Sequence, residues 1–409
     1  MRAQPTSVAV CYRDIYHVLE QFTQCAAASN GLDSPVSNGS ASPPIISLTP
    51  SSQETKKLER LGFGRHHWFT VVPSPRTARW LFPLPVGRAT TESFKLYAPY
   101  KRRAKILRAL ILALARTRWS GWARHKVLIS STGRLPLETL VREVTGEEQP
   151  VFAMSLGTDG KYRKLTLQVM RPEGEILGYI KLPLTAPACQ RVRHETAVLK
   201  HLASLPAMRS IVPKVLFSGT WGTSQLLFQS PGPFQPGPSE FGSVYDKFLQ
   251  QLWRLGSIKP AGLIWEEVGA QWRKTEASLD QEWRGLGHAA LRQASRDLAN
   301  ASIACGLIHG DFAPWNCRLG NGQLFVFDWE SAMWSAPSLW DVFHFRVQVA
   351  GLLKKEEELL FLPKRSVERA SFLLFLLNSV CQTIDEKCSR SQDFLNYKRN
   401  TLRREVARD

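Results

Sequence analysis

The sequence predicts an α+β fold in which an antiparallel sheet precedes a mainly helical region. Three consecutive stretches after residue 150 have the length and the apolar content of strands. They are residues 151–157, 164–170 and 176–182. Short runs of turn residues separate them, and consecutive strands joined by tight turns pair antiparallel. After Pro238 the pattern becomes helical and, apart from one loop and hairpin, stays so to about Lys387.

The remaining elements of the sheet region follow the same reasoning. Residues 164–170 alternate apolar and polar side chains, which is typical of a half-buried strand. Residues 192–202 have the spacing of an amphipathic helix, and residues 212–217 and 224–229 resemble two further strands. In the helical region, residues 372–377 are continuously apolar and predict a buried helix face.

Composition limits the class of protein. A chain of 409 residues with 44% hydrophobic residues can bury two or three cores. Its seven cysteines are scattered without a CxxC pair, which argues against a zinc ribbon or a disulfide framework and favours a reducing compartment. We find no membrane-spanning apolar stretch and no convincing secretory signal, so we expect a cytoplasmic protein.

The chain divides into five predicted regions. They are a disordered segment and linker over 1–55, a basic Arg- and Trp-rich region of unassigned role over 56–150, the sheet region over 151–232, the helical region over 233–390, and a polar tail over 391–409.

The net charge of +18 favours an anionic partner. Nine Lys and Arg and no acidic residue lie between Lys101 and Ser130, around an apolar helical stretch at 106–115. One interpretation is a partly buried helix with a solvated basic end. The other is a peripheral helix that binds an anionic surface, such as the inner face of the membrane, through residues 101–126. No nucleic-acid-binding motif surrounds it, which disfavours nucleic acid as the partner.

One short stretch carries chemistry. Residues 309–316 read His-Gly-Asp-Phe-Ala-Pro-Trp-Asn, so Asp311 and Asn316 can point into one cavity from a curled loop. Asp311 can accept the proton of an attacking hydroxyl, and Asn316 offers an oxygen to a hard cation such as Mg²⁺. Gly320-Asn321-Gly322 predicts a hairpin that returns the chain to this loop and ends at Asp328, a second metal ligand.

This run resembles the aminoglycoside phosphotransferase and choline kinase family, which has the two-lobed protein-kinase-like fold. His309-Gly310-Asp311, Asn316 and Asp328-Trp329-Glu330 match the catalytic and metal motifs of that family in order and spacing. The resemblance implies ATP and Mg²⁺ as cofactors, Asp311 as the catalytic base, and Asn316 and Asp328 as magnesium ligands. It makes His309 a structural brace and Asp341 an anchor of the catalytic loop; the alternative for Asp341 is a helix N-cap.

The resemblance also assigns roles in the sheet region. Lys181 and Glu195 match the pair that holds the α- and β-phosphates in this fold. Gly157 and Gly160 lie where a loop would cover the phosphates, although the segment departs from GxGxxG and a plain hairpin turn is the alternative. Gln229 and Gly232 occupy the expected adenine-binding hinge, where a simple linker is nearly as good an interpretation.

The acceptor is less well specified. Thirteen tryptophans include four near the catalytic stretch, which could stack on a sugar or quaternary ammonium or could belong to the core. Few acidic residues surround the loop, so a neutral or anionic sugar-like alcohol fits better than a polycation, unless Glu266, Glu267, Asp280 and Glu282 form an acidic wall. The rival functions are a protein kinase, disfavoured by the lack of Asp-Phe-Gly and Ala-Pro-Glu, and a catalytically silent nucleotide-binding scaffold.

Overall fold

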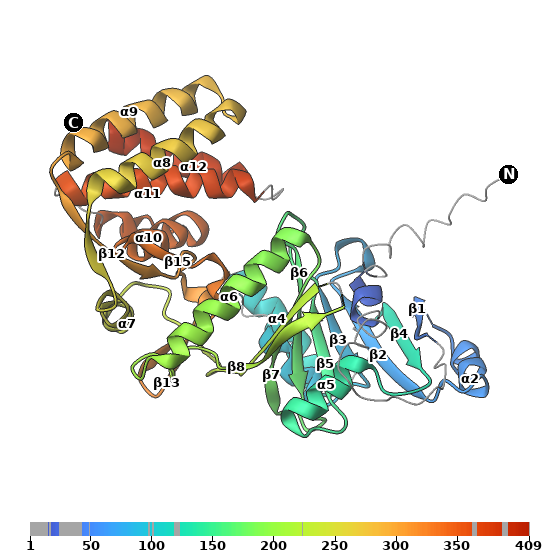
Figure 1. The fold of residues 1–409 in the computed structure, drawn as a ribbon. Helices are drawn as coiled ribbons and strands as arrows, with labels where there is room; N and C mark the ends of the chain where they lie inside the picture. Colours follow the sequence, from blue (N-terminus) through green and yellow to red (C-terminus); the bar gives the residue numbers. More distant parts are fainter. Residues whose placement is uncertain are drawn as a thin grey trace. The chain divides into compact units, whose positions relative to one another are not determined.

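The described residues fold into two compact units. The structure is a computed structural model that describes residues 15, 18–23, 43–48, 50–96, 99, 102–117, 123–222, 224–361, 366–386 and 392–408. Unit 1 comprises Met1–Thr158, Tyr162–Thr196 and Lys214–Pro231, and unit 2 comprises Asp159–Lys161, Ala197–Pro213 and Gly232–Asp409, each within the described residues. Figure 1 shows the sheet of unit 1 in blue to green and the helices of unit 2 in yellow to red.

Unit 1 is built on a nine-stranded antiparallel sheet with the order β1-β4-β2-β3-β5-β6-β7-β9-β8. The strands are β1 Ile45–Leu48, β2 Arg65–Val72, β3 Trp80–Leu84, β4 Lys126–Ser131, β5 Val151–Ser155, β6 Lys164–Met170, β7 Ile176–Pro183, β8 Val215–Trp221 and β9 Ser224–Gln229. The five strands predicted from the sequence correspond to β5 through β9, so the antiparallel sheet is confirmed.

The predicted boundary at residue 150 is wrong. Strands β1 to β4 belong to the same sheet as β5 to β9. The two groups are joined where β3 pairs with β5, through Trp80–Ser155 and Leu81–Met154. Residues 56–150 are therefore an extension of the sheet and not a separate region. The prediction of disorder over 1–55 is also wrong where the structure describes this segment: Ile15 and Phe22 are buried in the core, and β1 lies within it. Residues 34–42 of the predicted segment and linker lie outside the described residues.

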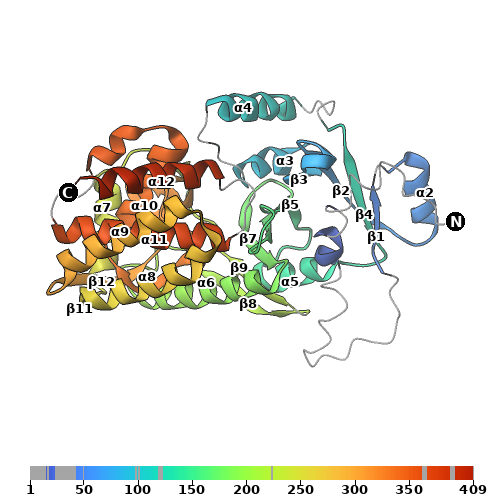
Figure 2. The same ribbon diagram turned by 90° about the horizontal axis from the view of Figure 1, so that it is seen from above.

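Apolar side chains cover both faces of this sheet. Alternation sends Leu81 and Phe152 to one face and Phe82 and Ala153 to the other. The first face packs against helix α5, and the second against α3 and part of α4, as Figure 2 shows. The helical elements of unit 1 are α2 Ser52–Arg60, η1 Pro75–Thr77, α3 Arg88–Ser93, η2 Phe94–Leu96, α4 Arg102–Arg116, α5 Pro136–Thr145 and the first part of α6 Ala186–Ser204.

Unit 2 is mainly helical, as predicted. Its helices are α7 Ser243–Trp253, α8 Ala261–Thr275, α9 Gln281–Leu298, α10 Trp340–Leu353, α11 Ser366–Asp385 and α12 Gln392–Val406, with 3-10 turns η3 Glu276–Ser278, η4 Pro314–Asn316, η5 Trp329–Ser331 and η6 Glu356–Phe361. The predicted apolar run at 372–377 is buried throughout on α11. The predicted polar tail is wrong, because α12 occupies it and buries Leu402 in the core.

Two small sheets accompany these helices. They are β10 Gln235–Pro236 with β13 Cys317–Gly320 and β14 Gln323–Val326, and β11 Ser257–Pro260 with β12 Ser302–Ile308 and β15 Met333–Pro337. The first contains the predicted Gly320-Asn321-Gly322 hairpin, in which Asn321 and Gly322 both have positive φ. The hairpin and the end of β12 together position residues 309–316.

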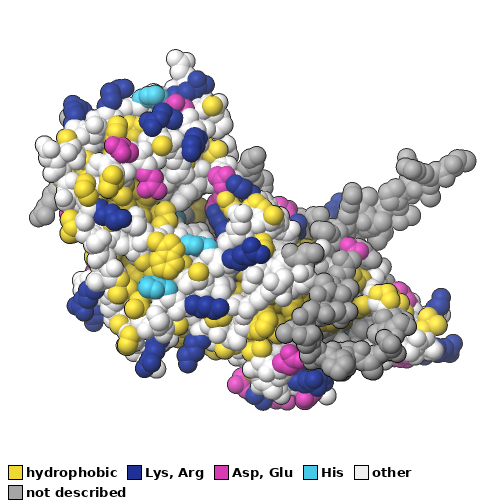
Figure 3. Space-filling model, viewed as in Figure 1, with side chains coloured by type: hydrophobic (Ala, Val, Ile, Leu, Met, Phe, Trp, Pro, Cys, Tyr) yellow, Lys and Arg dark blue, Asp and Glu magenta, His cyan; other side chains and the backbone are white. Residues whose placement is uncertain are grey.

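The surface adds two observations. Within the described residues, no helix is both long enough and apolar enough to cross a membrane. On the face shown in Figure 3, Lys and Arg side chains are spread over each unit and do not gather in one patch.

Candidate functional site

The stretch from His309 follows β12 directly and leaves it through a sharp turn. Gly310 takes a φ of +77°, and a Cβ atom there would collide with the backbone oxygen of Ser331. A glycine is therefore required for both reasons. The chain then passes through η4 and the β13–β14 hairpin, and it reaches Asp328 at the end of β14.

Asp341 fixes the backbone of this turn. Its Oδ2 accepts a hydrogen bond from the His309 amide at 2.8 Å, and its Oδ1 accepts one from the Gly310 amide at 2.9 Å. The side chain is fully buried, and burial raises the pKa of Asp341 above its ordinary value despite these hydrogen bonds and the nearby histidines. The alternative reading as an N-cap is wrong, because Leu339 occupies the cap position of α10.

His309 braces the same turn from its other side. Its Nδ1 lies 3.2 Å from the Asp311 amide, which donates to it, and its Nε2 lies 3.0 Å from the backbone oxygen of Phe327. The two contacts together favour the tautomer with the proton on Nε2. His309 is fully buried and also packs against the ring of Trp329. It thus ties the loop to the end of the hairpin.

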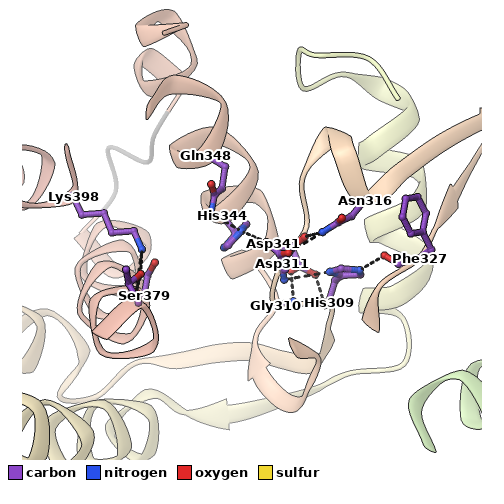
Figure 4. A network of polar contacts seen from close by, with 11 residues as sticks. His309, Gly310, Asp311, Asn316, Phe327, Asp341, His344, Gln348, Ser379 and Lys398 are labelled. Atoms are coloured by element: carbon purple, nitrogen blue, oxygen red, sulfur yellow. Dashed lines mark hydrogen bonds and ion pairs between the residues drawn. The ribbon is translucent and has the colours of Figure 1, made fainter. Parts of the chain in front are cut away.

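Asp311 lies at the centre of a polar network, drawn in Figure 4. The Asn316 amide nitrogen donates to its Oδ2 and to its backbone oxygen, each at 2.8 Å. The Nε2 of His344 lies 2.9 Å from its Oδ1. Burial raises the pKa of Asp311, but the hydrogen bond and the charge of His344 outweigh it and lower that pKa below its usual value.

The sequence reasoning missed His344. It lies on α10 three residues after Asp341, so both residues lie on the same side of the helix. Gln348, one turn further along, lies 3.1 Å from the same ring nitrogen. The spacing between Asp341 and His344 is a signal that could have identified this residue once the helix was predicted.

Asp328 and Asn316 fit a hard cation. Both nitrogen–hydrogen bonds of the Asn316 amide point to Asp311, which leaves its amide oxygen as an acceptor for another group. The Phe327 amide donates to the Asn316 backbone oxygen at 3.1 Å, which places the neighbouring Asp328 beside the loop. Carboxylate and amide oxygens are the ligands that Mg²⁺ prefers. The residues present therefore suit a magnesium ion.

Unit 1 contains the predicted Lys181–Glu195 pair. Lys181 lies on β7 and Glu195 on α6, and the Lys181 Nζ is 2.6 Å and 2.7 Å from the two carboxylate oxygens of Glu195. Both side chains are almost completely buried. A buried ion pair of this geometry holds the lysine at a fixed position on the sheet.

The other predicted nucleotide contacts are placed as follows. Gly157 and Gly160 lie in the β5–β6 connection, and Gly157, with a φ of +70°, packs against the backbone of Lys164. Gln229 ends β9, and its buried Oε1 has no hydrogen-bond partner among the described residues. Gly232 packs against the ring of Phe325. Their roles toward a nucleotide stay predictions.

Two predictions about the surroundings of the loop have clear outcomes. Trp329 and Trp340 belong to the core, whereas Trp334 is 47% exposed. Two of the four residues of the suggested acidic wall form ion pairs with arginines. Asp280 pairs with Arg399 at 2.7 Å, and Glu282 pairs with both Arg399 and Arg403.

Comparisons with known proteins find one family model and several solved structures to which this chain is similar. Residues 173–344 match the model of the phosphotransferase enzyme family. Similar solved structures include the apo form of a thermostable mutant of aminoglycoside phosphotransferase APH(4)-Ia, at 15% identity and a TM-score of 0.45, with 66% of this chain and 98% of that chain covered. Another is the GDP complex of wild-type aminoglycoside 2'-phosphotransferase-IIIa, at 12% identity and a TM-score of 0.43, with 66% of this chain and 98% of that chain covered. No curated protein matches the sequence. The matched range contains Lys181, Glu195 and the residues from His309 to His344, so this part of the chain is similar to kinase-type phosphotransferases of this family.

Proposed function

We propose that this domain transfers the γ-phosphate of ATP to a hydroxyl group of a small molecule. The observation that carries the proposal is the pairing of Asp311 with Asn316 at 2.8 Å, on a loop whose backbone Asp341 fixes. Phosphoryl transfer asks the protein to position the acceptor, the phosphates and the metal ions, with little covalent chemistry of its own. The arrangement around Asp311 suits that task.

Each residue of the network then has a role in the reaction. Asp311 orients the acceptor hydroxyl and accepts its proton, and its lowered pKa keeps the carboxylate ionised. Asn316 and Asp328 hold magnesium, which, when bound, neutralises charge on the phosphate being transferred. His309 and Asp341 keep the loop in place. His344, in contact with the Asp311 carboxylate, sets the direction of that side chain.

The proposed nucleotide contacts complete the proposal. Lys181 holds the α- and β-phosphates, and Glu195 positions the lysine side chain for them. Gly157 and Gly160 offer backbone amides to the phosphates from the β5–β6 connection. Gln229 and Gly232 bind adenine, and the unpartnered buried amide oxygen of Gln229 supports a polar ligand there.

The charges of unit 2 favour a neutral or anionic acceptor over a polycationic one. Asp280 and Glu282, which could have attracted a polycation, are paired with Arg399 and Arg403 on α12. A sugar-like or amino-alcohol acceptor without multiple positive charges is consistent with this balance. The chain's net charge of +18 acts in the same direction.

The segment after Asp328 favours a small molecule over a protein acceptor. The η5 turn, strand β15 and the start of α10 follow Asp328 without a long intervening loop. A protein kinase uses an activation loop in this place to bind and respond to its substrate. This chain has little room for one.

A metabolite-library assay tests the proposal. The wild-type protein is incubated with ATP and Mg²⁺, and mass spectrometry detects a product heavier by about 80 Da, the mass of the transferred group. In Asp311→Asn we expect transfer to fall by about 10²–10⁴-fold with ATP binding retained, because only the proton acceptor is lost. Asp328→Ala should in addition lose the Mg²⁺-dependent part of nucleotide binding.

Asp297→Asn on α9 is the matched control, since it changes the same side chain outside the network. It should keep wild-type transfer. Phosphorylation of proteins with no small-molecule product would favour a protein kinase, and slow ATP turnover that is identical in Asp311→Asn would favour a silent scaffold. Either result would overturn the proposal.

A further inference from the structure

Helix α4 turns an apolar face toward solvent. The exposed fractions of Ile106, Leu107 and Leu110 are 61%, 59% and 58%, and that of Leu114 is 38%. At 100° per residue these four side chains fall within about 100° of the helix circumference. A soluble helix ordinarily buries such a stripe, and contiguous exposed apolar surface marks an interaction site.

The opposite side of α4 is already occupied by unit 1. Ala115 is 1% exposed, and Ile111 and Leu112 pack against the cluster that contains Phe82 and Phe94. The Nε of Arg108 also donates to the backbone oxygen of Phe94 at 3.1 Å. Figure 2 shows α4 beside α3 on the outside of this unit. One side of α4 therefore packs against unit 1, and the side with the apolar stripe faces solvent.

The charges around α4 identify the chemistry of a partner. Residues 93–137 contain eleven Lys and Arg and no Asp or Glu. Lys105 and Arg116, one near each end of the helix, are exposed. At 100° per residue both lie on the same side of the stripe, about 80–100° from Ile106. A partner for this face must therefore accept apolar side chains at its centre and carry negative charge around them.

We propose that α4 docks on a membrane surface that contains anionic lipid, with Ile106, Leu107, Leu110 and Leu114 inserted at the interface. The helix has 15 residues, too few to span a bilayer, so it lies in the plane of the surface. Nucleic acid would match the basic residues but leave the leucines in water. An apolar protein groove would bury the leucines but not explain the absence of acidic residues. The inference does not depend on the proposed enzymatic reaction.

Vesicle flotation with the full chain tests the inference. The probes are vesicles of phosphatidylcholine alone and of phosphatidylcholine with phosphatidylglycerol. We expect the chain to float with the anionic vesicles at low salt, and to bind neutral vesicles at least tenfold more weakly. Binding should decrease as salt rises, because the electrostatic part is screened. The double variant L107E/L110E should lose at least tenfold in binding, because two carboxylates cannot enter the interface.

Leu61→Glu is the matched control. Leu61 is 61% exposed, like Ile106, but caps helix α2 outside the acid-free stretch, so the variant should float like the wild type. Circular dichroism melting should be the same for all three proteins, because the changed side chains are exposed. Absence of flotation, or equal flotation of L107E/L110E, would overturn the inference. The inference would also be overturned if the wild type did not bind vesicles but self-associated or retained nucleic acid, and L107E/L110E abolished that property.

Discussion

Among the described residues two lysines are buried, one in each unit, and their partners differ. Lys181 of unit 1 is 4% exposed and contacts both carboxylate oxygens of Glu195. Lys398 of unit 2 is 3% exposed and donates to neutral groups, the Ser379 backbone oxygen at 3.0 Å and the Thr383 hydroxyl at 2.6 Å. Burial lowers the pKa of Lys398 to about 7. The two lysines are equally buried, so burial alone does not distinguish them, whereas their partners do.

Lys181→Met should have the largest effect, because it removes a cation and leaves Glu195 buried without its partner. Breaking a buried ion pair from one side costs about 3–5 kcal/mol of stability. Transfer activity should fall at the same time, with the loss concentrated in the apparent affinity for ATP. Urea denaturation and steady-state kinetics at varied ATP concentration measure the two effects.

The double variant Lys181→Met with Glu195→Gln separates folding from function. Removing both charges should recover most of the lost stability, because no unpaired buried charge remains. Activity should stay low, because the phosphates still lack their cation. If activity returned together with stability, Lys181 would be a structural lysine of the same kind as Lys398, and the comparison would fail.

Lys398→Met should stabilise the folded chain, whereas Lys181→Met should destabilise it. The pKa of Lys398 is lower in the folded chain than the ordinary value of 10.5, so the unfolded chain binds more protons between about pH 7 and pH 10.5. Wild-type stability should therefore rise with pH across this window as the buried charge is lost. Below pH 7 the methionine variant should be more stable than wild type by about 1–4 kcal/mol, the range seen when buried charges become apolar.

Thr383 keeps its own hydrogen bond to the Ser379 oxygen at 2.8 Å in this variant, so no polar group is stranded. Denaturation at pH 6 and pH 9 measures the change, and the advantage of methionine should shrink at the higher pH. Lys247→Met, an exposed lysine on α7, should show neither effect. A constant difference between wild type and Lys398→Met at both pH values would mean that burial does not perturb this lysine.

The same contrast explains what the sequence could predict. The pairing of Lys181 with Glu195 was predictable because the family resemblance assigns it to a strand and the following helix, and local periodicity identifies both elements. The hairpin before Asp328 was predictable from its turn residues. Lys398 was not, because it lies on α12, where a mostly polar composition with a narrow apolar stripe suggested an exposed tail.

The sheet extension was missed for a related physical reason. Strand β1 pairs with β4 through Ile46 and Ile129, residues far apart in the sequence, and no local pattern specifies such a pairing. Exposure of the α4 stripe depends on which side of that helix packs against the extended sheet, so the sequence left two interpretations open. His344 was missed because its role depends on where α10 lies relative to the catalytic loop.

We expect His344→Gln to have the smallest effect, which is on kcat. This variant tests whether the contact from His344 or the charge of Lys398 influences Asp311. The Nε2 of His344 lies 2.9 Å from the Asp311 carboxylate, whereas Lys398 acts on it only through longer-range charge. Glutamine keeps a donor but not the ring geometry, so kcat should fall by about tenfold or less, since a hydrogen bond to a charged group contributes about 1.5–3 kcal/mol in full. The KM for ATP should not change, and the kcat of His344→Leu, which has no donor, should fall further.

Lys398→Met should keep kcat within about twofold on the same bound, because it removes no hydrogen bond to Asp311. Equal losses in kcat for His344→Gln and Lys398→Met would show that the local charge matters and the contact does not; a graded loss through glutamine and leucine shows that His344 positions the base.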